Sequence, residues 1–364
     1  MNSFFNQLFT SKPSMRTQYK LKFLSPVLQL IILASLLLQL WGCEKEEALY
    51  PQPKVAAGLQ TATFEMGETY SNQLWFDFES QKTFSNQFGK WDVGFSCSGE
   101  PHITICGGKS AFLSVAKVTD VDFEHIDGSL MQNLNWKFDN PNGHIDSLAF
   151  SGCFAKQSNG YIGKPNETYV IDLGVDTIPT KRYVKMQFLS VRGGVYEFLW
   201  SYVLDPQFLY LTKVFTKPDR NYAYFNFSTM QLVENEPVAL NEWDLVFTTY
   251  KESIPDVNGL MYPYIIRGAL INPFKISVAQ IDGGIPFDQF NFQDAQSLMY
   301  NKNVNEIGYD WKEYSQSASK YTMVPNRYYV IKTINGNYFK MRFIDFYDDK
   351  GRKGYPKMAW EILK

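Results

Sequence analysis

Few side chains in this 364-residue chain have the chemistry of a catalytic or metal-binding group. The histidines are three, His102, His125 and His144. The sequence contains no Gly-x-Ser-x-Gly elbow, no His-Glu-x-x-His helix, no phosphate-binding glycine loop and no dinucleotide fingerprint. Carboxylate pairs such as Asp348-Asp349 occur where turns are expected, and nothing places two carboxylates across a cleft as a glycosidase requires. An enzyme is therefore the weaker functional class, and a binding protein the stronger one.

The four cysteines divide into one near the N-terminus and three later ones. Cys97, Cys106 and Cys153 follow Cys43 at spacings that match no Cys-x-x-Cys zinc or redox motif. Cys97 and Cys106 are nine residues apart and are expected on adjacent hairpin strands. In an oxidising compartment they are the best candidates for a disulfide. The same thiols could equally stay reduced and packed.

The apolar run that ends at Cys43 has the features of a bacterial secretion signal. Basic residues precede an apolar stretch at 23–41, and the first acidic residue is Glu44. Length alone also allows a membrane-spanning helix, which needs about 20 apolar residues. The sequence predicts a signal peptide over residues 1–42, with Met15 as an alternative start.

The tetrad Leu-Trp-Gly-Cys at residues 40–43 favours the secretion signal over the spanning helix. It resembles the lipobox of bacterial lipoproteins, in which a cysteine after a small residue is acylated before the signal is removed. Two acyl chains hold a protein stably on a bilayer, whereas one does not. The resemblance implies that an acylated Cys43 anchors the chain through a lipidated tether, residues 43–60. The acidic string at 44–47 resembles an export tag for the cell surface, although a solvated linker would look the same.

Composition favours a strand-rich protein and excludes one class of partner. Removing residues 1–42 leaves 322 residues, with a formal net charge of −6 in place of −2, because that segment holds four basic residues and no acidic one. A phosphate backbone would be repelled, and no basic cluster compensates, so nucleic acid is not expected. Aromatic residues make up 16% of the chain, which favours strands.

Alternation of apolar and polar residues with period two begins near Thr61 and continues to the C-terminus. It is clear at 61–66, 74–78, 183–188 and 338–343, and Gly- or Asn-rich turns separate such segments. The sequence therefore predicts an all-β, antiparallel fold.

Short strings recur in the same order along the chain. Lys-Trp-Asp-Val-Gly-Phe at 90–95 corresponds to Glu-Trp-Asp-Leu-Val-Phe at 242–247, and Tyr-Val-Lys-Met-Gln-Phe at 183–188 corresponds to Tyr-Phe-Lys-Met-Arg-Phe at 338–343. Because several such matches stay in order with similar offsets, the sequence predicts an internal duplication. The expected β-rich domains are 61–218 and 219–364.

The repeated unit resembles the HmuY family, haem-binding surface lipoproteins of Bacteroidetes. The marks are the two Trp-Asp strands (Trp91, Trp243), the glycine turn after each, and the ending of the second unit, residues 305–364. The resemblance implies a non-catalytic lipoprotein of the outer membrane that captures haem at the cell surface. Its implied partners are haem or a haem-carrying protein, the outer-membrane lipid and an outer-membrane receptor.

In that family, His or Met side chains hold the haem iron as axial ligands. The position after the Trp-Asp strand that can carry a ligand histidine holds Ser96 in one unit and Thr248 in the other. The remaining axial candidates are His102, Met261, Met299 and Met323. Each could instead be a surface or packing residue. The alternative function is a surface adhesion or assembly lipoprotein that has lost haem binding and holds a protein or glycan.

Overall fold

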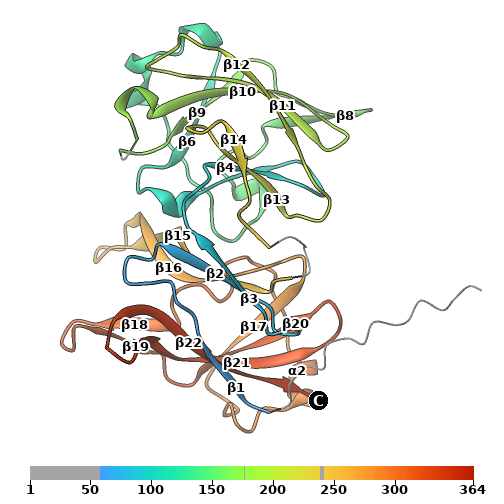
Figure 1. Cartoon of the computed structure of the whole chain (residues 1–364), viewed down its shortest axis with the longest axis vertical. Helices are drawn as coiled ribbons and strands as arrows, with labels where there is room; N and C mark the ends of the chain where they lie inside the picture. The colour runs from blue at the N-terminus through green and yellow to red at the C-terminus, as the bar shows by residue number, and fades with distance from the viewer. Residues whose placement is uncertain (1–57, 176, 238–241) are drawn as a thin grey trace, which may run out of the picture. The chain divides into compact units, whose positions relative to one another are not determined.

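The computed structural model describes residues 58–175, 177–237 and 242–364 (Figure 1). The predicted signal peptide, the lipidation site Cys43 and nearly all of the tether lie outside the described residues. The described part belongs to one compact unit, residues 53–364. Within the described ranges no helix has the length and apolar character needed to cross a bilayer.

Antiparallel strands form most of the regular secondary structure in the described ranges, which confirms the predicted all-β class. The first eleven strands are β1 (Gln60–Thr63), β2 (Asn72–Phe76), β3 (Thr83–Gln87), β4 (Val93–Ser96), β5 (Ile103–Ile105), β6 (Ser114–Thr119), β7 (Phe154–Gln157), β8 (Gly160–Gly163), β9 (Glu167–Asp172), β10 (Tyr183–Arg192) and β11 (Val195–Tyr202). The next eleven are β12 (Tyr210–Phe215), β13 (Tyr222–Asn226), β14 (Gln231–Val233), β15 (Leu245–Pro255), β16 (Met261–Ile271), β17 (Ile276–Asp282), β18 (Lys312–Ser315), β19 (Lys320–Met323), β20 (Arg327–Thr333), β21 (Tyr338–Tyr347) and β22 (Lys353–Leu363). The described helical elements are the short helix α2 (Phe292–Gln296) and the 3-10 turns η1 (Gly107–Lys109), η2 (Phe123–His125), η3 (Gly128–Asn133), η4 (Ile145–Ser147) and η5 (Pro179–Lys181).

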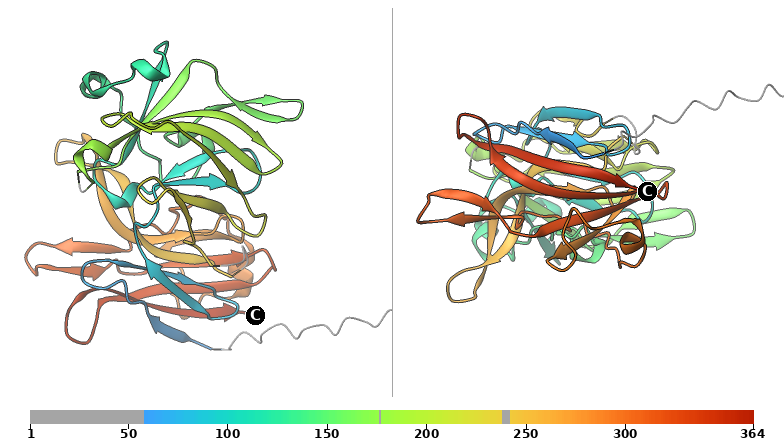
Figure 2. Two further views of the ribbon diagram at one scale, coloured as in Figure 1. Left: turned by 45° about the horizontal axis from the view of Figure 1, so that its top comes forward. Right: turned by 90° about the horizontal axis from the view of Figure 1, so that it is seen from below.

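Turn residues and side-chain alternation explain why these strands form. β10 and β11 are joined by Gly193 and Gly194, which both have positive φ and so close a two-residue hairpin that matches the twist of the strands. In β21 and β22, red in Figure 2, alternate residues such as Phe339, Met341 and Trp360 enter the core. The predicted period-two pattern thus describes which side chains of these strands join the hydrophobic core.

The first three strands pair with the second half of the chain. β1 pairs with β22, and β2 pairs with β15, so that the sheets run β1-β22-β21-β20-β17 and β16-β15-β2-β3. The buried residues also come from both halves of the chain. Phe64, Phe76 and Phe78 belong to one hydrophobic core with Phe247 and Trp360. The N-terminal segment 60–87 therefore completes a core made mainly by residues 245–363.

Strands from the middle of the chain pair in turn with strands of the first half. β12 pairs with β11, and β13 pairs with β4, which gives the sheets β12-β11-β10-β8-β7, joined by β9 and β6, and β14-β13-β4-β5. Phe225 and Phe227 belong to one core with Val93 and Phe198. Neither predicted segment, 61–218 or 219–364, holds all the strands of its own sheets. Segment 61–218 supplies β1, β2 and β3 to the sheets of the other segment, whereas segment 219–364 supplies β13 and β14.

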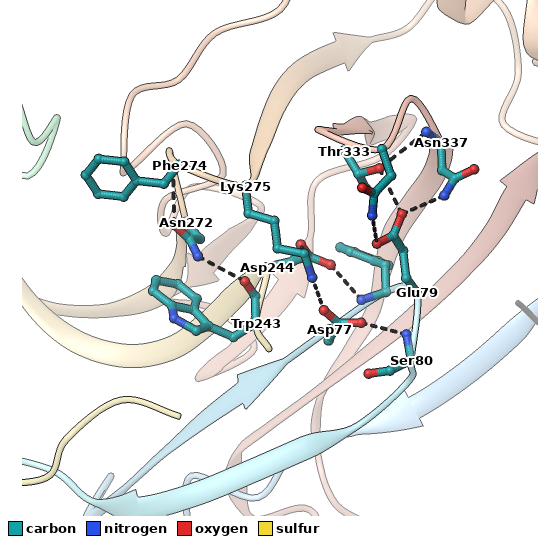
Figure 3. Close-up of polar contacts among 12 residues, drawn as sticks. Asp77, Glu79, Ser80, Trp243, Asp244, Asn272, Phe274, Lys275, Thr333 and Asn337 are labelled. Atoms are coloured by element: carbon teal, nitrogen blue, oxygen red, sulfur yellow. Dashed lines mark hydrogen bonds and ion pairs between the residues drawn. The ribbon is translucent and has the colours of Figure 1, made fainter. Parts of the chain in front are cut away.

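Asp244, which follows Trp243, binds the hairpin of β2 and β3, and this hairpin comes from the other half of the chain (Figure 3). Its backbone N–H donates to Phe76 O at 2.7 Å, and its Oδ2 accepts from Phe78 N at 2.7 Å. Lys275 is buried beside it, 3.3 Å from Asp244 Oδ1, and also pairs with Asp77 at the end of β2. Burial raises the pKa of Asp244 to about 7. One lysine thus holds two buried carboxylates, one from each half of the chain.

Asp92 of the first Trp-Asp strand has the corresponding contacts. Its backbone N–H donates to Phe225 O at 2.9 Å, and its Oδ2 accepts from Phe227 N at 2.8 Å. Lys109 Nζ lies 2.5 Å from Asp92 Oδ1. Asn226 of β13 occupies the position that corresponds to Asp77, the residue after β2. Its Oδ1 accepts a hydrogen bond from Thr229 N, so the ion pair of Lys109 contains the single carboxylate of Asp92. The Trp-Asp motif is therefore the point where each half binds the hairpin of the other.

Two buried lysines, Lys185 and Lys340, account for the recurring string at residues 183–188 and 338–343. Lys185 in β10 donates to Phe123 O and Ile126 O at 2.8 and 3.1 Å. Lys340 in β21 donates in the same way, at 2.9 and 3.1 Å, to Phe287 O and Phe290 O. Each lysine satisfies two carbonyls of the connection that covers its sheet, which accounts for a lysine at an otherwise apolar position.

Candidate functional site

A cavity of about 200 Å³ lies between the two four-stranded sheets. Its walls are formed by residues of β2, β5, β13, β15 and β16, together with η1 and parts of the connections between strands. In β2, for example, Leu74 and Phe76 enter the core, whereas Gln73 and Trp75 line the cavity. Because each sheet contains strands from both halves, the cavity depends on the exchange of hairpins.

Aromatic rings form most of the apolar wall. Trp75 and Trp243 meet edge to face with ring centroids 4.7 Å apart and an interplanar angle of 78°. Trp91 and Tyr224 lie at the same centroid distance with an angle of 56°. Trp75 and Tyr224 occupy corresponding places in β2 and β13, as Trp91 and Trp243 do before β4 and β15. Both halves thus contribute equivalent aromatic residues.

A network of buried amides fixes one polar side of the cavity. Gln73 Nε2 donates to Asn235 Oδ1 at 2.6 Å, and Thr248 Oγ1 donates to Gln73 Oε1 at 3.0 Å. Asn86 Nδ2 donates to the backbone oxygen of Asn235. These side chains are bound to one another and hold the wall rigid.

The two charged residues of the cavity, Lys251 and Asp139, are held by structural hydrogen bonds. Lys251 Nζ donates to Ala111 O at 2.9 Å and to Leu113 O at 2.7 Å, and burial lowers its pKa to about 8. Burial raises the pKa of Asp139, whose carboxylate accepts hydrogen bonds at 2.6, 2.7 and 2.8 Å from Thr104 Oγ1, Ile105 N and Ala149 N. Neither group is free to transfer a proton to a ligand.

His102, the best-placed histidine of the sequence prediction, precedes β5 and is 9% exposed. Its Nδ1 lies 2.8 Å from Glu100 O, and its Nε2 lies 3.1 Å from Tyr222 OH. Burial lowers the pKa of this imidazole. Since both ring nitrogens have protein partners, neither is available as an axial ligand in this structure.

The three methionine candidates lie on separate elements. Met261 begins β16 and is 54% exposed, Met299 follows α2 and is 93% exposed, and Met323 ends β19 against the edge of a core. None of them lines the cavity, and neither does His102. The structure therefore does not bring the four predicted ligands together in this cavity, and the residues present do not fit a haem iron with two axial ligands there.

The hydroxyls at the expected histidine positions also have protein partners. Ser96 Oγ lies 2.8 Å from Tyr196 OH, and Thr248 binds Gln73. In the described ranges no cluster of three or more His, Cys, Asp or Glu side chains could hold a metal ion.

The predicted disulfide between Cys97 and Cys106 is not formed, because both thiols are free, as is that of Cys153. β4 and β5 do form the expected hairpin, with Val93 opposite Ile105. Continuing this register puts Cys106 opposite Asp92, five residues from Cys97 along β4. A strand rises about 3.4 Å per residue, so about 17 Å separates the two positions, far beyond the reach of a disulfide.

Comparison with known proteins gives one matching family model and several matching solved structures. Residues 219–360 match the family model described as HmuY protein. No curated protein matches the sequence. Apo PinO from Porphyromonas gingivitis is 10% identical over 85% of this chain and 99% of its own, with a TM-score of 0.24. The apo HmuY analog of Tannerella forsythia is 11% identical over 85% and 97%, with a TM-score of 0.24. A Bacteroides vulgatus protein described as HmuY-like and heme-binding is 15% identical over 38% and 83%, with a TM-score of 0.17.

Proposed function

We propose that this chain, whose residues 219–360 match the HmuY family model, is a lipid-anchored protein of that family that binds a ligand without transforming it. The observation that carries this proposal is the aromatic cavity, whose charged residues Lys251 and Asp139 are held by structural hydrogen bonds. Such a site can retain a molecule, and its charged residues are not free to act as acid or base. The free thiol of Cys106 also lines the cavity, but burial raises its pKa to about 12, so it stays protonated and is a poor nucleophile.

We further infer that the chain arose by duplication. Strands β1, β2 and β3 have the same partners in one half as β12, β13 and β14 have in the other. The paired contacts of Asp92 and Asp244, and of Lys185 and Lys340, support the same inference. On this basis a repeat begins at a strand of the β1 or β12 type, and its first three strands cross to the other repeat.

Haem is the ligand that the family relationship suggests, and the placement of His102 and Met261 argues against its coordination here. We expect hemin added to residues 44–364 to give no sharp Soret band with defined stoichiometry. The titration is followed by absorbance, with free hemin as the reference. A sharp 1:1 band would restore haem as the ligand, and its shift in either H102A or M261A would identify that residue as a ligand.

We propose that Cys43 carries the anchor and that the protein faces outward from the outer membrane. The Cys43→Ala variant lacks the sulfur that would be acylated, so we expect it to leave the membrane fraction. Fractionation of cells that express either form, followed by immunoblotting, measures this. Continued retention of the variant in membranes would contradict lipidation. Protease shaving of intact cells tests the outward orientation separately.

The alternative function is adhesion or assembly through a protein or glycan partner, and one observation favours it. The hairpin of β15 and β16 extends beyond the sheet, and near its end Val257, Leu260, Met261, Tyr262 and Tyr264 are exposed. Exposed apolar groups that are contiguous in this way often mark an interaction surface. Absence of any small-molecule binding together with intact folding would favour this second function.

A further inference from the structure

The size of the cavity limits what it can hold. Its volume is about 200 Å³. Apolar cavities of about 150 Å³ accept a single benzene ring, whereas sites for drug-sized ligands measure about 300–1,000 Å³. A molecule of one or two fused rings therefore fits, and a complete tetrapyrrole would require the two sheets to separate.

The walls favour a flat aromatic molecule over an aliphatic one. Trp75 and Trp243 already meet at right angles, and Trp91 and Tyr224 are tilted against each other. Aromatic rings prefer such edge-to-face or offset contacts at centroid distances of 4.5–7 Å. A further ring can extend this arrangement, and Val246 packs against both Trp75 and Trp243 at the same wall.

Three of the residues that line the cavity have a buried polar atom without a hydrogen-bond partner in the described ranges: Asn221 Oδ1, Trp243 Nε1 and Tyr250 OH. Asn221 Oδ1 is the amide oxygen among them and can only accept a hydrogen bond. Asn221 is 4% exposed, and its Oδ1 accepts no hydrogen bond from the described residues. The backbone N–H of the same residue is bound to Glu236 Oε1 at 2.8 Å, and the neighbouring amides Gln73 and Asn235 are bound to each other. A buried acceptor without a donor is unfavourable, so an O–H or N–H group of a ligand would stabilise it.

We propose that the cavity binds a one- or two-ring aromatic molecule that carries a hydrogen-bond donor, such as a phenol or an indole. The ring lies among Trp75, Trp243 and Tyr224, and its donor binds Asn221 Oδ1. This inference rests on the proposed ligand-binding function and names the chemical class of the ligand. The site is incomplete without both halves, because Trp75 and Asn221 come from different repeats.

The test compares 2-naphthol with naphthalene, which has the same rings and no donor. Each is titrated into residues 44–364, which include the whole compact unit, and tryptophan emission and calorimetry report binding. We expect both to bind, with 2-naphthol about fivefold tighter, the effect of one neutral hydrogen bond. Asn221→Leu should erase this difference while naphthalene still binds. Asn221→Ala serves if the leucine variant does not fold.

Blocking variants locate the binding. Val246→Phe or, as a second choice, Leu270→Phe should fill the cavity and reduce the affinity for both compounds at least tenfold. Leu211→Phe adds the same ring on the exposed face of β12 and should change neither affinity. The inference is wrong if wild-type protein binds neither compound, if both blocking variants bind normally, or if the preference for 2-naphthol survives in Asn221→Leu. In each of these cases a hemin-specific band would still support the proposed function with another ligand.

Discussion

Replacing Lys275 by methionine is expected to lower the free energy of unfolding by about 3–5 kcal/mol at pH 8. Lys275 is the buried cation between Asp77 and Asp244, and methionine would leave both carboxylates without it. The expected cost is large because each carboxylate is almost fully buried. Urea unfolding followed by tryptophan fluorescence measures the change.

The pH dependence of this loss distinguishes buried charge from simple packing. The pKa of Asp244 is raised from 3.8 to about 7, so the folded state holds more protons than the unfolded state between these values. Stability contributed through Asp244 therefore falls as pH rises across that window. Without the lysine the carboxylates are easier still to protonate, so the deficit of the variant should shrink between pH 8 and pH 5. An equal deficit at both values would contradict the charge argument.

The corresponding variant Lys109→Met is the matched control. Lys109 binds the single carboxylate of Asp92, and its side chain is 24% exposed, so water can reach the carboxylate when the cation is removed. We expect a smaller loss, about 1–3 kcal/mol. A loss as large as that of Lys275→Met would mean that the ion pairs of Lys109 and Lys275 contribute equally to the free energy of unfolding.

Phe78→Ala is expected to cost about 3–5 kcal/mol and to act on the distant half of the chain. Phe78 follows β2 near the N-terminus, but its ring lies 5.3 Å from that of Phe339 in β21 and is fully buried. The variant leaves a cavity in the core formed mainly by residues 245–363. Native-state hydrogen exchange should show faster exchange in β20, β21 and β22 than in β9, β10 and β11.

Phe84→Ala provides the control for this change. Phe84 lies in β3 of the same hairpin and is 45% exposed, so its removal should change stability by less than about 0.5 kcal/mol. If Phe78→Ala instead loosened β9, β10 and β11 first, the hairpin would belong to the nearer half.

Sequence patterns predicted the strands well but not their partners. The alternation at 74–78 identifies a strand with one apolar face, and Trp91 and Trp243 mark the two strands on which the hairpins dock. Because both halves carry the same pattern, β2 and β13 suit either Trp-Asp strand equally well. Pairing between such distant segments depends on the three-dimensional path of the chain, which local periodicity does not contain.

The predicted boundary between the domains 61–218 and 219–364 shows the same limit. A proline and several charged residues interrupt the strand pattern there, but β12 at 210–215 already occupies the place that β1 has in the other half. The short strings used to detect the repeat begin at Trp91 and Trp243, after the exchanged strands. The second repeat that we propose therefore begins without a sequence marker of its own.

The candidate site was only partly accessible from sequence. Trp91 and Trp243 were recognised as family marks, whereas Gln73, Asn221 and Asn235 look like ordinary surface amides until the sheets face each other. An alignment of the two strands that precede the Trp-Asp motifs would have matched Trp75 with Tyr224 as equivalent positions. The cysteine hairpin was predicted correctly, and only its register excludes the bond between Cys97 and Cys106.

Disulfide trapping of the exchanged strands tests the central claim most directly. In residues 44–364 with the native cysteines replaced by serine, Thr61→Cys is combined with Ala359→Cys, its partner in the register of β1 and β22. The control combines Thr61→Cys with Leu199→Cys, the corresponding position in β11. The account predicts an intramolecular disulfide, identified by peptide mass, in the first pair and none in the second. Cross-linking of the second pair, with the first left as free thiols, would contradict the exchange and the shared cavity that depends on it.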